Sequence, residues 1–141
     1  MRLAHRHLAI VLVLAATFLV AGCDLLGGGS DGLTGKTWQW VASTTTAPAS
    51  QSVVPDPENY TIEFMDDGTF AARVDCNQVA GEYMSPGGGA MTITPGPSTL
   101  VACPEGSLAD LYLAGLATTE SYEIAGGELV LTTGDGTMTF E

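Results

Sequence analysis

The sequence predicts a small α+β fold made mainly of antiparallel strands with one helix. Two regions, 60–76 and 120–141, alternate apolar and polar residues with the period of a half-buried strand, and short Gly-containing turns interrupt them. Ser107–Ala117 carries apolar residues at helical spacing instead. Strands joined by short turns pair antiparallel, which favours this fold class over a parallel βαβ arrangement.

The N-terminus has the features of an export signal. A basic start, Met1–His7, precedes an apolar stretch, Leu8–Ala21, that is shorter than the about 20 residues of a spanning helix. It ends in Val20-Ala-Gly-Cys23, and small residues before a cysteine resemble the bacterial lipobox, in which the cysteine is lipidated. We therefore expect a lipoprotein signal peptide at 1–22. An ordinary cleaved signal peptide and an uncleaved anchor are the alternatives.

Lipidation at Cys23 would attach the protein to a membrane surface, because two or more acyl chains anchor stably. The residues after Cys23 are Gly/Ser-rich and predict a flexible tether over 23–32, followed by one domain at 33–141. The expected location is the cell membrane or outer envelope, facing the periplasm or exterior.

Charge and composition exclude several function classes. After processing, the basic side chains are Lys36 and Arg73 against sixteen acidic residues, a formal net charge of −14. Nucleic-acid binding needs basic phosphate contacts and is not expected. The mature chain has no histidine, which removes the usual general base and metal ligand. We expect no catalytic residues, no metal and no cofactor.

Two cysteines, Cys76 and Cys103, remain after lipidation of Cys23. In an oxidising compartment such a pair predicts a disulfide, worth roughly 3–4 kcal/mol in the chain-entropy model. The alternative is a metal site, but two thiolates without histidine or CxxC spacing form a poor zinc ligand set.

The first strand is expected at Leu33–Val41, with Trp38 and Trp40 on one face. Ala42–Glu58 is rich in Ser, Thr, Ala and Pro and reads as a mobile loop. The two tryptophans are either core residues or, together with this loop, a binding surface.

A hairpin is expected at 60–76, with a turn at Asp66-Asp67-Gly68. A three-residue turn pairs Phe64 with Phe70, and the alternation places Cys76 on the core side of the second strand. Asp66–Gly68 lacks the spacing of a calcium loop.

The middle of the chain predicts a Gly-rich loop at Ser85–Ala90 and a short strand at 91–94 that Pro95-Gly-Pro97 ends. A helix follows from about Ser107, a plausible N-cap, to Ala117. Its expected core-facing stripe is Leu108, Leu111, Tyr112, Gly115 and Leu116.

Three further strands are expected near the C-terminus. Gly126-Gly127 forms a two-residue turn that pairs Ile124 with Leu129. Asp135-Gly136 suggests a type I′ turn, which places Leu131 opposite Phe140.

In order and spacing these segments resemble the META domain, or HslJ-like, family of bacterial envelope lipoproteins. The resemblance covers nearly all of 33–141 and rests on motifs whose matching residues are Trp38, Cys76, Asn77, Gly81, Tyr83, Thr99 and Cys103. It implies a sheet curled into a partly open barrel with one packed helix, in which Cys103 clips the segment before the helix to Cys76. Departures from the family pattern at Asp75 and Ala109 affect fine detail and leave the fold unchanged.

The resemblance implies no established catalytic activity and a link to envelope or heat stress. We expect a membrane-tethered, non-enzymatic accessory module that binds an unidentified envelope protein or small ligand. The alternative is a small-ligand or lipid carrier that uses the barrel interior. A third hypothesis, a hydrolase with paired carboxylates among Glu63, Asp75 and Glu82, needs two carboxyl groups about 5–10 Å apart.

Overall fold

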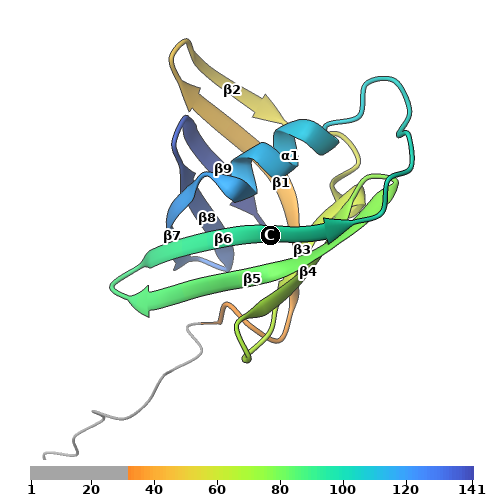
Figure 1. Cartoon of the computed structure of the whole chain (residues 1–141). Helices are drawn as coiled ribbons and strands as arrows, with labels where there is room; N and C mark the ends of the chain where they lie inside the picture. Colours follow the sequence, from red (N-terminus) through yellow and green to blue (C-terminus); the bar gives the residue numbers. More distant parts are fainter. Residues whose placement is uncertain (1–31) are drawn as a thin grey trace, which may run out of the picture.

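The computed structural model describes residues 32–141 (Figure 1). The predicted signal peptide, Cys23 and all but the last residue of the predicted tether lie outside the described residues. Within the described part, no helix has the length and apolar character needed to cross a membrane.

The described chain is built mainly from strands, with one α-helix and one short 3-10 helix. In chain order the elements are β1 Thr37–Thr46, β2 Ala49–Val53, η1 Pro57–Asn59, β3 Tyr60–Phe64, β4 Thr69–Val74, β5 Asn77–Gly87, β6 Ala90–Ser98, α1 Ala109–Ala117, β7 Thr119–Ala125, β8 Glu128–Thr133 and β9 Gly136–Phe140.

The strands form one antiparallel sheet in the order β2-β1-β3-β4-β5-β6-β7-β8-β9, and a further β1–β9 pairing closes it into a ring. The ring is weakest between β6 and β7, which pair only through Ala90 and Ser121. Helix α1 packs on β6 and β4 and lies across the ring at this weak side (Figure 1). The predicted partly open barrel with one packed helix is confirmed.

The ring is filled with large side chains. The largest fully buried residues are Trp38, Trp40, Tyr112, Phe64, Phe70, Phe140, Ile62, Met91, Ile93, Leu116, Leu129 and Leu131. Both tryptophans are therefore core residues, and the alternative that they form a binding surface is excluded. The Trp38 indole donates to the Leu33 carbonyl at 2.8 Å, and the Lys36 ammonium lies 3.4 Å from the centroid of the Trp38 ring.

The predicted mobile loop at Ala42–Glu58 is also wrong, because most of it forms a hairpin. β1 continues to Thr46 and pairs with β2 from Ala42↔Val53 to Thr46↔Ala49. A bulge at Val41 lets β1 change register against β9 between Trp40 and Ala42. The Ser/Thr-rich segment has the β-branched residues of a strand, and its polarity reflects exposure on both faces.

The hairpin of β3 and β4 has the predicted register. Phe64 pairs with Phe70 and Tyr60 with Val74. Gly68 adopts a left-handed φ of 85°, as its place in the turn requires.

The β5–β6 region is more regular than predicted. Gly88 and Gly89 form a short turn, so the expected loop at Ser85–Ala90 is mostly strand. β6 continues through Pro95 and Pro97 to Ser98, where the prediction ended it at Thr94. Most of one edge of β6 is unpaired, because it meets β7 only at Ala90. A proline costs no ladder hydrogen bond on such an edge.

Helix α1 begins at Ala109, two residues later than predicted. Ser107 does accept a hydrogen bond from the Ala109 N–H at 3.2 Å, but the N-cap position belongs to Leu108.

Of the residues expected on the face of helix α1 that packs on the sheet, Tyr112 and Leu116 are buried, whereas Leu111 is 53% exposed. Gly115 faces Met138 of β9, whose sulfur occupies the space that a Cβ would need.

In the C-terminal sheet, β7–β8 has the predicted Ile124↔Leu129 pair and β8–β9 does not have the predicted register. Leu131 pairs with Met138 instead of Phe140, because the turn consists of Gly134 and Asp135.

Gly136 belongs to β9, where the Thr44 backbone of β1 leaves no room for a Cβ. The glycine therefore permits ring closure and does not form the turn.

Candidate functional site

The site lies where the β4–β5 turn meets the segment between β6 and α1. β4 ends at Val74, which pairs with Asn77 of β5, so Asp75 and Cys76 form a tight turn. Asp75 has a φ of 56°, a left-handed conformation that aspartate tolerates better than most residues. This turn leaves Cys76 exposed. The prediction that Cys76 points into the core is wrong, because it assumed that the strand continues to residue 76.

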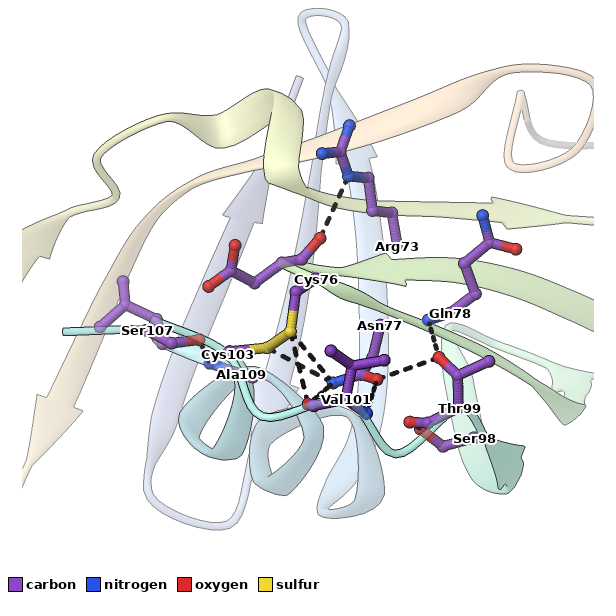
Figure 2. Close-up of a disulfide and its surroundings, with 12 residues drawn as sticks. Arg73, Cys76, Asn77, Gln78, Ser98, Thr99, Val101, Cys103, Ser107 and Ala109 are labelled. Atoms are coloured by element: carbon purple, nitrogen blue, oxygen red, sulfur yellow. Dashed lines mark hydrogen bonds between the residues drawn. A yellow bond between two sulfur atoms is a disulfide. The ribbon is translucent and has the colours of Figure 1, made fainter. Parts of the chain in front are cut away.

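A disulfide joins this turn to the segment before the helix. Cys76 and Cys103 are bonded, with Cα atoms 5.4 Å apart and a sequence separation of 27 residues. The bridge fixes one end of the irregular segment 99–103, which we call the stapled loop (Figure 2).

The side chain of Asn77 holds the middle of the stapled loop. Its Nδ2 donates to the Val101 carbonyl at 2.9 Å, and its Oδ1 accepts from the Val101 N–H at 2.8 Å. The amide thus satisfies both backbone groups of one loop residue, as a neighbouring strand would. Nδ2 also lies 3.3 Å from the Cys103 sulfur and 3.4 Å from the Cys76 sulfur, which couples the amide to the disulfide (Figure 2).

Thr99 connects the loop to β5. Its hydroxyl donates to Asn77 Oδ1 at 3.0 Å and accepts from the Gln78 N–H at 3.0 Å. The Thr99 N–H in turn donates to the Gln78 carbonyl at 3.1 Å. The structure therefore brings together four of the motif residues named above, Cys76, Asn77, Thr99 and Cys103.

The other motif residues have roles in the sheet. Gly81 admits the Phe70 ring, since a Cβ would lie 2.6 Å from it and would also clash with the Thr94 carbonyl. The Tyr83 hydroxyl donates to the Met65 carbonyl at 2.7 Å, and its ring lies 4.9 Å from that of Phe64. Together with the buried Trp38, these residues support the barrel at a distance from the stapled loop.

The stapled loop presents apolar side chains to solvent. Leu100 is 96% exposed and Val101 is 59% exposed. Their exposure would be unremarkable on a mobile segment, but here the backbone is held by a covalent bond and by the Asn77 amide. Sequence reasoning missed these two residues. The available signal was the apolar run Leu100-Val-Ala102 beside a cysteine expected to be paired.

A groove lies on each side of the loop. One, of about 520 Å³, runs between the loop and helix α1 and is lined by Leu100, Val101, Pro104 and Leu113 among others. The second, of about 590 Å³, lies over the outer faces of β3, β4 and β5, with Ala71 and Ala80 among its lining residues. Ser98 and Thr99 belong to both grooves, so the loop forms a ridge between two hollows.

The residues of the hydrolase hypothesis start from separate positions in the sheet. Asp75 lies level with Asn59, to which its N–H donates, and Glu63 lies four residues further along β3, about 13 Å at the rise of a strand. Glu82 of β5 pairs with Thr69 of β4. It therefore lies two strands away from Glu63 of β3 and two residues further along the strand direction. The backbone positions in each pair are thus more than about 10 Å apart, and no two of these three residues are partners on adjacent strands. The described residues contain no cluster of three or more potential metal ligands.

The shifted titratable groups lie away from the loop. Hydrogen bonds from the Thr69 hydroxyl and N–H lower the pKa of the exposed Asp67 carboxyl in the β3–β4 turn. Burial raises the pKa of Tyr112 well above its ordinary value, and its hydroxyl has no hydrogen-bond partner among residues 32–141. Burial also raises the pKa of Tyr83, and none of these three groups lines a groove beside the stapled loop.

A family model described as the META domain matches residues 31–141. No curated protein matches the chain. A solved structure of a DUF4847 family protein from Bacteroides vulgatus has a TM-score of 0.56 and 15% identity, covering 77% of this chain and 92% of its own. An NMR structure of a protein from Burkholderia xenovorans has a TM-score of 0.61 and 21% identity, covering 77% and 82%. These structures share the fold.

Proposed function

The chain belongs to the META domain family, and from that premise we propose that it is a membrane-tethered, non-enzymatic envelope module that binds a partner protein through the stapled loop. The observation that carries the proposal is the rigid exposure of Leu100 and Val101. A loop whose backbone is already held in place loses little further backbone entropy on binding, so more of the burial energy of its apolar side chains is available for affinity.

The charge around the loop favours a particular kind of partner surface. Asp110 lines the groove beside helix α1, Glu105 follows the disulfide in sequence, and Asp75 lies in the turn next to Cys76. The mature chain as a whole is strongly acidic. A partner with an apolar pocket and a basic rim fits this surface, and opposite charges accelerate association at low salt.

The tether is the second part of the proposal. Residues 20–23 support lipidation at Cys23, and a short Gly/Ser-rich segment would then hold the domain near the membrane. Tethering raises the effective concentration of the domain for partners on the same surface. A role in envelope or heat stress agrees with this arrangement and with the family.

A carrier function through the barrel interior has less support. Trp38, Trp40, Phe64, Phe70 and Phe140 are each at most 1% exposed and fill the ring. A ligand of ordinary size would have to displace these rings, whose contacts stabilise the core.

The test uses the full-length lipoprotein in its native envelope. A photo-crosslinking amino acid replaces Leu100, and in a matched strain it replaces Met84, an exposed apolar residue of β5 at 69% exposure. We expect one discrete crosslinked species from position 100 and none from position 84. Asn77→Ala in the same background should weaken the crosslink, because the loop is released while Leu100 remains.

Two results would contradict the proposal. One is equal crosslinking from both positions, which would indicate nonspecific apolar contact. The other is a crosslink from position 100 that Asn77→Ala leaves unchanged, since the rigid presentation of the loop would then be irrelevant. If Cys23→Ser abolishes the crosslink while the protein still reaches the same compartment, the membrane tether is required for the interaction.

A further inference from the structure

The outer edge of β2 is an unpaired sheet edge with a defined set of free backbone groups. Among residues 32–141, β2 pairs with β1 on one side only. The Val54 N–H donates to the Val41 carbonyl at 2.9 Å, which sets the phase of this ladder. In an antiparallel pair, hydrogen-bonding residues alternate along each strand. The N–H and C=O groups of Ala49, Gln51 and Val53 therefore point away from β1.

This edge lacks the features that usually prevent strand pairing. Natural sheets protect edges with charged side chains, prolines or covering segments. From Thr37 to Pro55 the chain has no charged residue, and all five residues of β2 are exposed. The only proline between the ends of β1 and β2 is Pro48, which lies in the turn.

The charge distribution favours a second copy of this chain as the partner for the edge. All the charged residues of the described chain lie outside 37–55, so approach elsewhere brings acidic surfaces together. The β1–β2 hairpin projects from the ring, at the end of the molecule opposite to the first described residues (Figure 1). Two copies that meet through β2 thus place their charged surfaces apart.

The strand is also complementary to itself. When two copies of β2 pair antiparallel with Gln51 opposite Gln51, Ala49 of each copy lies opposite Val53 of the other. All three outward-facing residues then meet outward-facing residues, and their backbone groups pair. Val53, now 80% exposed, gains an apolar neighbour. We propose that the protein forms a homodimer through this antiparallel β2–β2 pairing.

The test is sedimentation equilibrium of the full-length lipoprotein in a nonionic detergent over a dilution series. We expect a dimer that dissociates on dilution. Gln51→Lys places two ammonium groups side by side at the symmetry axis. Gln51→Pro removes an N–H that makes no bond within residues 32–141. Each change should raise the dimer Kd at least about tenfold, because the central pairing is lost.

The matched control is Gln78→Lys, the same substitution at an exposed position of β5. It should leave the dimer Kd unchanged, which separates a local effect from a change in net charge. Near-UV circular dichroism and the mass of the oxidised chain confirm that each variant is folded. If Gln51→Pro does not fold, Gln51→Lys alone decides the question.

A wild-type chain that remains monomeric at every concentration would overturn the proposal, and the edge would then be free for a strand of another protein. A dimer that persists unchanged in Gln51→Lys would overturn it as well. The edge of β2 is a different surface from the stapled loop, so either proposal can fail without the other.

Discussion

The stapled loop and the β1–β2 hairpin are both exposed, but they are held by different means. The loop has irregular backbone, so a disulfide and the side chain of Asn77 supply the contacts that a ladder would provide. The hairpin has a regular ladder and needs no such clamp, but the ladder leaves one edge of β2 unpaired. The stapled loop thus exposes apolar side chains on a backbone that is held in place, whereas the β1–β2 hairpin exposes unpaired backbone groups.

Removal of the disulfide is the strongest test of this difference. The Cys76→Ser, Cys103→Ser double variant should lose about 3.5 kcal/mol of unfolding free energy, the chain-entropy value for a closed loop of this length. Urea denaturation of the full-length protein with and without reductant measures it. A loss below about 1 kcal/mol would mean that Asn77 alone holds the loop.

Asn77→Ala should have the next largest effect. The variant removes two hydrogen bonds to Val101 and one to Thr99, and we expect a loss of about 2 kcal/mol because the freed groups can reach water. Gln78→Ala is the control, since the Gln78 side chain makes no hydrogen bond within the described chain. Equal urea midpoints for the two variants would refute the clamp.

The two clamps should also be coupled. In the Cys76→Ser, Cys103→Ser background, Asn77→Ala should cost less than in the wild type, because the loop is already released. A double-mutant cycle from the same denaturation data gives the coupling energy. Strict additivity would indicate that the disulfide and the amide act independently.

In the hairpin, Thr44→Val should have a smaller effect. It keeps the shape of the side chain and removes the 2.7 Å hydroxyl–hydroxyl bond to Thr137 of β9. We expect a loss of about 1 kcal/mol in the same urea assay. Thr132→Val, on the exposed face of β8, should be close to neutral. A Thr44→Val loss as large as that of Asn77→Ala would contradict the view that the ladder alone is sufficient.

Amide hydrogen exchange should distinguish the stapled loop from the outer edge of β2 in the wild-type protein, with no substitution. The Val101 N–H donates to Asn77 Oδ1 and should exchange more slowly than that of Leu100, for which the structure gives no partner within residues 32–141. The Gln51 N–H should exchange rapidly in dilute protein. Protection that is equal at Val101 and Leu100 would show that the clamp is open in solution.

Local sequence signals correctly predicted strand register where a short turn joins two strands that are consecutive in the chain. Gly126 and Gly127, both at positive φ, set the β7–β8 register, and the Asp66–Gly68 turn set that of β3 and β4. The predicted β8–β9 register was wrong because Gly136 is a glycine for a different reason: the Thr44 backbone of the distant strand β1 leaves no room for a side chain there. In the local sequence, a glycine required by such a contact looks the same as a glycine required by a turn.

The candidate site was predictable only in part. The pairing of Cys76 with Cys103 follows from export and cysteine number, but the exposure of Cys76 depends on the left-handed Asp75, which nothing in the alternation of β4 indicates. The role of Asn77 depends on Val101, far along the chain, whose position the disulfide fixes. The hairpin that occupies 42–53 was missed because the exposed residues of β2 give no apolar alternation.

The closure of the ring has a consequence for biosynthesis. β1 meets β9 through pairs such as Trp40↔Phe140, so the first strand of the ring is completed by the last. A chain synthesised from its N-terminus must hold the indole of Trp40 without its final neighbour until the last residues emerge. Contacts so distant in sequence form slowly, so we expect the β1–β9 pairing to be among the last to form and the apolar face of β1 to stay exposed until then.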